Sequence, residues 1–179
     1  MMTWSLGPSC GDLIVMTGVA GPAAKMGHHL TLAMRSWRVD VQWRGKRPFT
    51  AELTVDVDSL EVVKGEGGVT PLAGPQKAVA RANALKSLDS KKYPRIRFAA
   101  NAIEPSAVGY RLVGELEIHG RTLPRTVEVA VDESGDDLTV SVEATVAQSD
   151  FGIKPLSLMM GTLKVDDEVT VVFSGHHPK

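Results

Sequence analysis

Residues 138–146 read Leu-Thr-Val-Ser-Val-Glu-Ala-Thr-Val, so every second residue in this stretch is apolar. Successive side chains of a β-strand point to opposite faces, and this alternation therefore predicts a strand with one apolar and one polar face. The same period recurs in residues 49–58, 95–102, 114–118 and 126–131. The pattern is typical of antiparallel sheets, in which one face packs on a core and the other meets water.

Shorter segments add strands near both ends of the chain. We expect a first strand at residues 12–17, and a closing pair formed by 163–165 and 169–173 around Asp166-Asp167-Glu168. Between residues 30 and 43 the apolar parity switches, which predicts a bulge or bend near 35–38. Short turns at 108–110, 119–121 and 134–137 connect neighbouring segments, and connections of this length favour antiparallel pairing.

One segment departs from the period of two. Residues 65–75 are rich in Gly and Pro and predict a loop, after which Val79, Ala82, Leu85 and Leu88 recur at helical spacing. We expect a helix at about 76–88, with Pro75 at its first turn. The chain is thus predicted to be mainly all-β, a single domain over 1–179 with about eight antiparallel strands that form a barrel or a two-sheet sandwich.

Composition excludes several classes of partner. Twenty basic and 21 acidic residues leave a net charge of -1, which gives no electrostatic reason to expect a nucleic acid. The single cysteine, Cys10, cannot form an intrachain disulfide. No segment approaches the roughly 18 apolar residues that an integral membrane span needs, and the N-terminus has no basic, apolar leader pattern. These features predict a cytoplasmic protein.

Three short motifs, in order, resemble those of the YceI-like, polyisoprenoid-binding family. Residues 92–98 (Lys-Tyr-Pro-Arg-Ile-Arg-Phe) resemble the family's K-Y-P-x-I-x-F stretch. Residues 114–124 resemble its G-x-L-x-I-H-G-x-T-x-P hairpin, and 149–153 (Ser-Asp-Phe-Gly-Ile) its turn before the last strands. The resemblance implies an eight-stranded, lipocalin-like antiparallel barrel with one helix over its side. It also implies a lumen that holds an extended isoprenoid chain or similar lipid.

Strand parity then predicts which side chains face this lumen. The interpretation is a protein that carries or sequesters a polyisoprenoid, an isoprenoid quinone or a similar lipid, with no cofactor and with a homodimer as one possible assembly. The expected ligand-binding residues are Leu30, Leu32, Trp43, Leu53, Val55, Ile96, Phe98, Leu116, Val129, Val142 and Phe173.

Other interpretations stay open at this point. The barrel could be filled by its own side chains and act as a stress-response or protein-interaction module. It could be a small hydrolase or isomerase that uses His119 with Asp150, although no catalytic signature motif is present and we predict no catalytic residue. We expect His119 to bond nearby backbone in its turn, and Asp150 to cap the turn at residues 151–152.

The histidine pairs are a candidate metal site. His28-His29 could act with His176-His177, but neighbouring strand residues point to opposite faces and cannot easily share one ion. We therefore predict no metal site.

Overall fold

A computed structural model describes residues 1–179 and forms one large antiparallel sheet, one small sheet and one α-helix. The large sheet has eleven strands in the order β1-β5-β6-β8-β9-β10-β11-β14-β2-β4-β7. Its strands are β1 (Met2–Leu6), β2 (Gly11–Met16), β4 (His28–Met34), β5 (Trp37–Arg44), β6 (Arg47–Asp56), β7 (Leu60–Gly67), β8 (Arg95–Pro105), β9 (Gly109–Ile118), β10 (Arg121–Asp132), β11 (Asp137–Ala147) and β14 (Glu168–Pro178). The small sheet joins β3 (Val19–Ala20), β12 (Ser157–Leu158) and β13 (Leu163–Val165).

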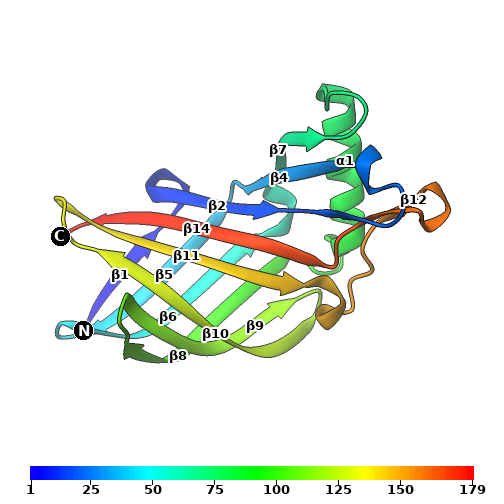
Figure 1. Cartoon of the computed structure of the whole chain (residues 1–179). Coiled ribbons are helices and arrows are strands. Elements are labelled where there is room, and N and C mark those ends of the chain that lie inside the picture. Colours follow the sequence, from blue (N-terminus) through cyan, green and yellow to red (C-terminus); the bar gives the residue numbers. More distant parts are fainter.

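A bent strand closes the large sheet on itself. Only Arg35 and Ser36 separate β4 from β5, yet β4 pairs with β2 and β7 whereas β5 pairs with β1 and β6. The ladder continues across the bend, since Arg35 N donates to Ser59 O (3.2 Å) and Asp56 N donates to Ser36 O (3.0 Å). The strand order therefore returns to its start, and the sheet curls around one interior (Figure 1).

The predicted count of about eight strands corresponds to the staves of this barrel. If β1/β2, β4/β5 and β6/β7 are each counted as one bent stave, the eleven strands make eight. The breaks lie at the short 3-10 helix Pro8–Cys10, at Arg35–Ser36 and at the 3-10 helix Val57–Ser59. The parity switch expected near 35–38 is therefore a bend between two half-strands, and the antiparallel barrel class is confirmed.

Two expectations about the chain ends were wrong. The strand expected to come first, at residues 12–17, is preceded by β1. In β1 the apolar residues Trp4 and Leu6 share one parity. The expected closing pair does not form: β13 pairs with β3 and β12, whereas β14 pairs with β11 and β2. The cause lies at the junction before β14, where Asp166 N donates to Gly18 O (2.9 Å) and directs this segment toward β3.

The wall is not hydrogen-bonded evenly. β10 pairs with β11 only from Ala130 to Asp132, and the two strands diverge beyond that point (Figure 1). If their register continued, Glu128 would stand opposite Glu143. Like charges directly opposite each other destabilise a strand pair, so this juxtaposition disfavours continuation of the ladder.

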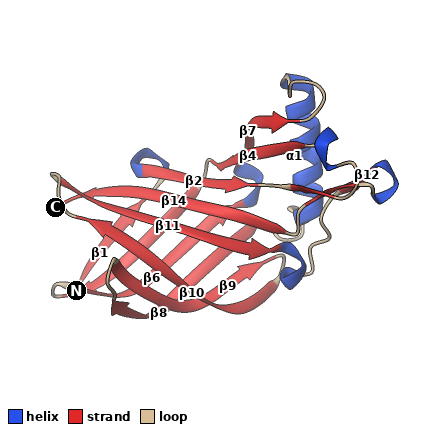
Figure 2. Ribbon diagram, in the orientation of Figure 1, coloured by secondary structure: helices blue, strands red, loops and turns tan.

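The helix α1 (Gly74–Leu88) lies at one end of the barrel beside β7, as Figure 2 shows. Its bounds confirm the predicted 76–88, with Pro75 in the first turn and Asp89 in the left-handed conformation at the C-cap. The guanidinium of Arg81 ties the helix to the wall by donating to Leu60 O (2.8 Å) and Asp58 O (2.6 Å). No helix of the chain has the length and hydropathy needed to cross a membrane.

The packed core has two parts. The larger part surrounds Trp37, whose ring meets Phe173 edge-on with the centroids 5.2 Å apart. The smaller part gathers Ile118, Val146, Phe151 and Ile153 where β10 and β11 diverge. The barrel interior also contains a cavity, and this places the candidate site.

Candidate functional site

The barrel interior contains a cavity of about 680 Å³. Of the 56 residues that line it, 44 are hydrophobic, so a molecule inside would meet an almost wholly apolar wall. The lining extends from Val79 and Ala84 on α1 to Trp4 and Trp43 at the opposite end of the barrel. This volume lies within the range of about 300–1,000 Å³ that is usual for small-molecule sites.

All eleven residues that parity assigned to the lumen lie on the wall of this cavity. Leu32 and Val55 are 5% and 2% exposed and belong to the packed core, so they shape the wall from behind. The other nine are half-buried, as expected for side chains that face a void. That any of the eleven contacts a ligand stays a prediction.

Several wall residues were missed by the sequence reasoning. α1 supplies Val79, Ala80, Ala84 and Leu88, although only its helical spacing had been noticed. Arg125 on β10 also lines the cavity, and it has the same parity as Val127 and Val129. The signal for Arg125 was therefore present in the alternation, but the run had been started one residue too late to include it.

An aromatic group occupies the end of the cavity opposite α1. The Trp4 ring stacks on His177 with centroids 4.0 Å apart and planes 4° apart, and it lies 4.5 Å from the Trp43 ring. The buried Nε1–H of Trp43 has no hydrogen-bond acceptor. This end of the lumen thus combines apolar ring surface with one free donor.

The three sequence motifs meet at the outer edge of the barrel. The ring of Tyr93 meets His119 edge-on, with centroids 4.8 Å apart, and lies over Gly120. His119 Nδ1 lies 3.1 Å from Phe151 O, and Arg121 donates to Asp150 O (2.9 Å). We call this group the clasp; it joins residues distant in sequence around the smaller part of the core.

The contacts of the clasp show which hydrogen bonds His119 and Asp150 make. His119 bonds a backbone carbonyl, as predicted for a turn histidine. Asp150 contributes its carbonyl oxygen, and the prediction that its side chain caps the turn is wrong. The carboxylate of Asp167 accepts hydrogen bonds at the start of this segment, from Ser149 N (2.7 Å) and Ser149 Oγ (2.5 Å). The geometry provides no contact between the His119 ring and the Asp150 carboxylate.

The two histidine pairs lie at opposite ends of the barrel. His28 pairs with Gly67 near α1, whereas His176 and His177 pair with Thr139 and Leu138 near the β10–β11 hairpin. The His28 ring lies 2.6 Å from Thr70 O. No group of three or more His, Cys, Asp or Glu side chains is placed to hold a metal ion.

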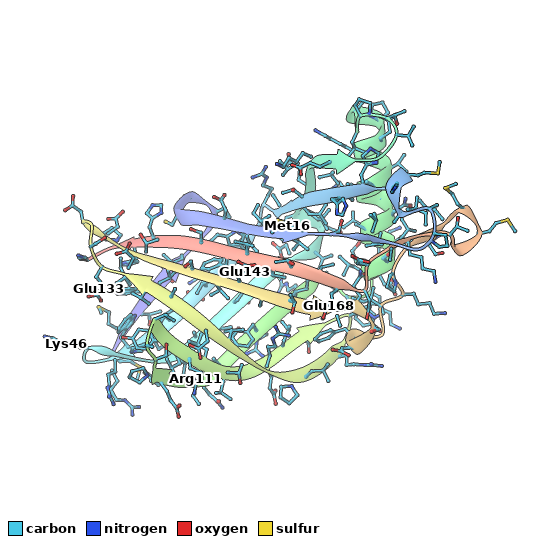
Figure 3. All side chains as sticks on the ribbon, viewed as in Figure 1. Met16, Lys46, Arg111, Glu133, Glu143 and Glu168 are labelled. Carbon is cyan, nitrogen blue, oxygen red and sulfur yellow. The ribbon has the colours of Figure 1, made fainter.

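Charged side chains lie mainly on the outer face, as the stick view in Figure 3 shows for Lys46, Arg111, Glu133, Glu143 and Glu168. Ion pairs brace that face: Arg97 binds both carboxylate oxygens of Glu52 at 3.0 Å, and Arg111 binds Glu128 at 2.7 Å. The hydrogen bonds from Arg97 lower the pKa of Glu52 despite its partial desolvation. These pairs hold the charges of Arg97, Glu52, Arg111 and Glu128 on the outer face.

Comparison with known proteins places this geometry in a family. The family model for the YceI-like domain matches residues 21–176. The crystal structure of Burkholderia cenocepacia BcnA is similar, with a TM-score of 0.72 and 19% identity over 96% of this chain and 99% of that one. The crystal structure of a Campylobacter jejuni YCEI protein that crystallises with large solvent channels is also similar. Its TM-score is 0.62, with 10% sequence identity over 83% of this chain and 84% of that one. No match is found among curated protein sequences.

Proposed function

This chain belongs to the YceI-like family, and we propose that it binds one long apolar molecule in its lumen and carries or sequesters it. A polyisoprenoid, an isoprenoid quinone or a similar lipid chain fits this description. The observation that carries the proposal is the apolar cavity of about 680 Å³, which is walled by all eight staves and by α1.

The driving force is the removal of apolar surface from water. Each Å² of apolar surface that the chain and the wall remove from water contributes about 25 cal/mol of binding free energy, so 100 Å² contributes about 2.5 kcal/mol. The barrel is already folded around the void, and binding therefore needs little ordering of the protein. Few polar groups on the wall compete for water, since 44 of the 56 lining residues are hydrophobic.

The extent of the cavity favours a chain over a compact ligand. Its lining reaches from α1 at one end to the Trp4 and Trp43 rings at the other. A long, flexible hydrocarbon can follow such a space and bury most of its length. A homodimer is a separate expectation, which sedimentation of the purified protein would test.

A matched pair of substitutions on β11 tests the proposal. Val142 faces the cavity, whereas its neighbour Ser141 is exposed on the outer face of the same strand. We expect Val142→Trp to fill the lumen and abolish uptake of geranylgeraniol, measured by native mass spectrometry, and Ser141→Trp to take it up like the wild type. If the wild type takes up no chain, the proposal fails and the module with surface function is favoured.

A further inference from the structure

One arginine, Arg125, belongs to the largely apolar wall of the cavity. Arg125 lies on β10, lines the cavity and is half-buried. Its parity is that of Leu123, Val127 and Val129, which also line the lumen or pack in the core. Two other charged residues border the cavity: Glu52, whose carboxylate Arg97 holds from the outer face, and Lys164, which is exposed on β13 of the small sheet.

Arg125 has no partner within the protein. Its neighbour Arg121 binds Asp150 O, and Arg111 on the paired strand binds Glu128. None of the six ion pairs of the structure includes Arg125. Arg125 is half-buried, and partial removal of a guanidinium from water costs free energy that a counter-charge offsets. Since no carboxylate of the chain pairs with Arg125, its guanidinium is available to an anion from outside the chain.

The wall makes room beside this guanidinium. We use the word rung for a row of residues, one from each strand, that are paired in register across neighbouring strands. On the rung of Arg125, the facing residues are Gly114, Ala100 and Ala51, all small. A Cβ at Gly114 would overlap the backbone of Ala99, so no larger residue fits there without a shift.

The neighbouring rung toward α1 is bulky. It carries Leu123, Leu116, Phe98 and Leu53 in the same order of strands. On the other side, Val127 faces Leu112, which faces Ile103. On β9, β8 and β6 the wall beside Arg125 is thus lined by small side chains, before the rung continues to Val41 and Trp4, and this leaves space for a long side chain together with a head group.

From this arrangement we propose that Arg125 binds an anionic head group, so that the preferred ligand is a long apolar chain ending in a carboxylate or a phosphate. This inference rests on the proposed lumen binding and specifies its chemical class. A guanidinium is planar, permanently charged and matched to two oxygens of either anion. The apolar rungs on both sides then hold the chain, and the low dielectric around them strengthens the charge pairing.

The experiment compares probes that share a chain and differ in the head. Wild-type protein is titrated with palmitate and hexadecanol, and with geranylgeranyl phosphate and geranylgeraniol. Arg125→Met keeps much of the side chain's volume and removes its charge. Arg111→Met is the matched control, since Arg111 is an outward-facing arginine on the paired strand. Arg125→Lys keeps the positive charge but lacks the planar guanidinium that can bind two oxygens at once.

We expect wild type to bind each anionic probe more tightly than its alcohol. Arg125→Met should raise the Kd of the anions about ten- to a hundredfold and leave the alcohols unchanged, while Arg125→Lys falls between and Arg111→Met behaves as wild type. The unchanged alcohols show that the variant barrel is folded. Equal affinity for acid and alcohol, or equal weakening of both in Arg125→Met, would overturn the inference. If none of the four probes binds the wild type or any variant, it is the proposed function that fails.

Discussion

Gly120→Ala should destabilise the barrel through the clasp. Gly120 has φ +74°, and a non-glycine residue in this left-handed region costs about 1–2 kcal/mol. A Cβ here would also overlap the Tyr93 ring, with two further ring atoms 3.0 Å away. The ring must then move off His119, which loses an edge-on aromatic contact worth about 0.5–1.5 kcal/mol. We expect a total loss of about 2–3 kcal/mol.

Gly45→Ala separates the two contributions. Gly45 has φ +63°, and a Cβ there would meet nothing within 4 Å, so this variant reports the backbone cost alone. The assay is equilibrium urea unfolding of both variants, alone and combined with Tyr93→Ala. Gly120→Ala should cost more than Gly45→Ala in the wild-type background and about the same amount once Tyr93 is removed. If Gly120→Ala lowered the free energy of unfolding by the same amount with and without the Tyr93 ring, the role assigned to that ring would be refuted.

Three further predictions concern an ion pair, the core and the β10–β11 ladder. Glu52→Gln should cost at most about 1 kcal/mol at neutral pH because the pair with Arg97 is half exposed. Since the pKa of Glu52 is lowered in the folded state, the wild-type advantage should be complete above the usual carboxyl range and vanish as pH falls through that lowered pKa; urea titrations at several pH values would show it, and an advantage that persists in acid would contradict it. Trp37→Ala should lower the unfolding free energy by about 3–5 kcal/mol, because Trp37 is 5% exposed and packs on the core; a loss below about 1 kcal/mol would contradict this packing. Glu143→Lys should extend the β10–β11 ladder by placing a positive charge opposite Glu128, and slower amide exchange at residues 126–129 would show it; unchanged exchange would mean that charge does not stop the ladder.

The apolar parity predicted the wall well because the period of a strand is exact. Phe98, Val129 and Val142 lie far apart in sequence, yet each faces the same cavity, since any inward position of a closed barrel must face it. The three motifs were also recognisable, and their meeting in the clasp explains why Tyr93, His119 and Gly120 occur together.

The parity switch near 35–38 predicted one of the three breaks between half-strands, but the breaks at 8–10 and 57–59 were not predicted. Alternation shows where a strand runs, and it does not show where a bent strand changes its pairing partners. β3, β12 and β13 have two or three residues each, too few for any period to be visible. The pairing of β13 with β3 depends on contacts near Asp166 and Gly18, which are distant in the chain.

Arg125 shows a different limit. A strand pattern predicts which face a residue occupies, but a charged residue on the apolar face is easily taken for the start of a turn. Only the three-dimensional wall shows that its rung is lined by Gly114 and Ala100 and that it has no ion-pair partner.

The most direct test is a crystal structure of the protein after incubation with geranylgeranyl phosphate. Lumen binding with an anionic head group predicts continuous electron density through the cavity, in contact with Phe98 and Val142, with the phosphate at Arg125. Density confined to the outer surface, or a lumen closed by its own side chains, would contradict it.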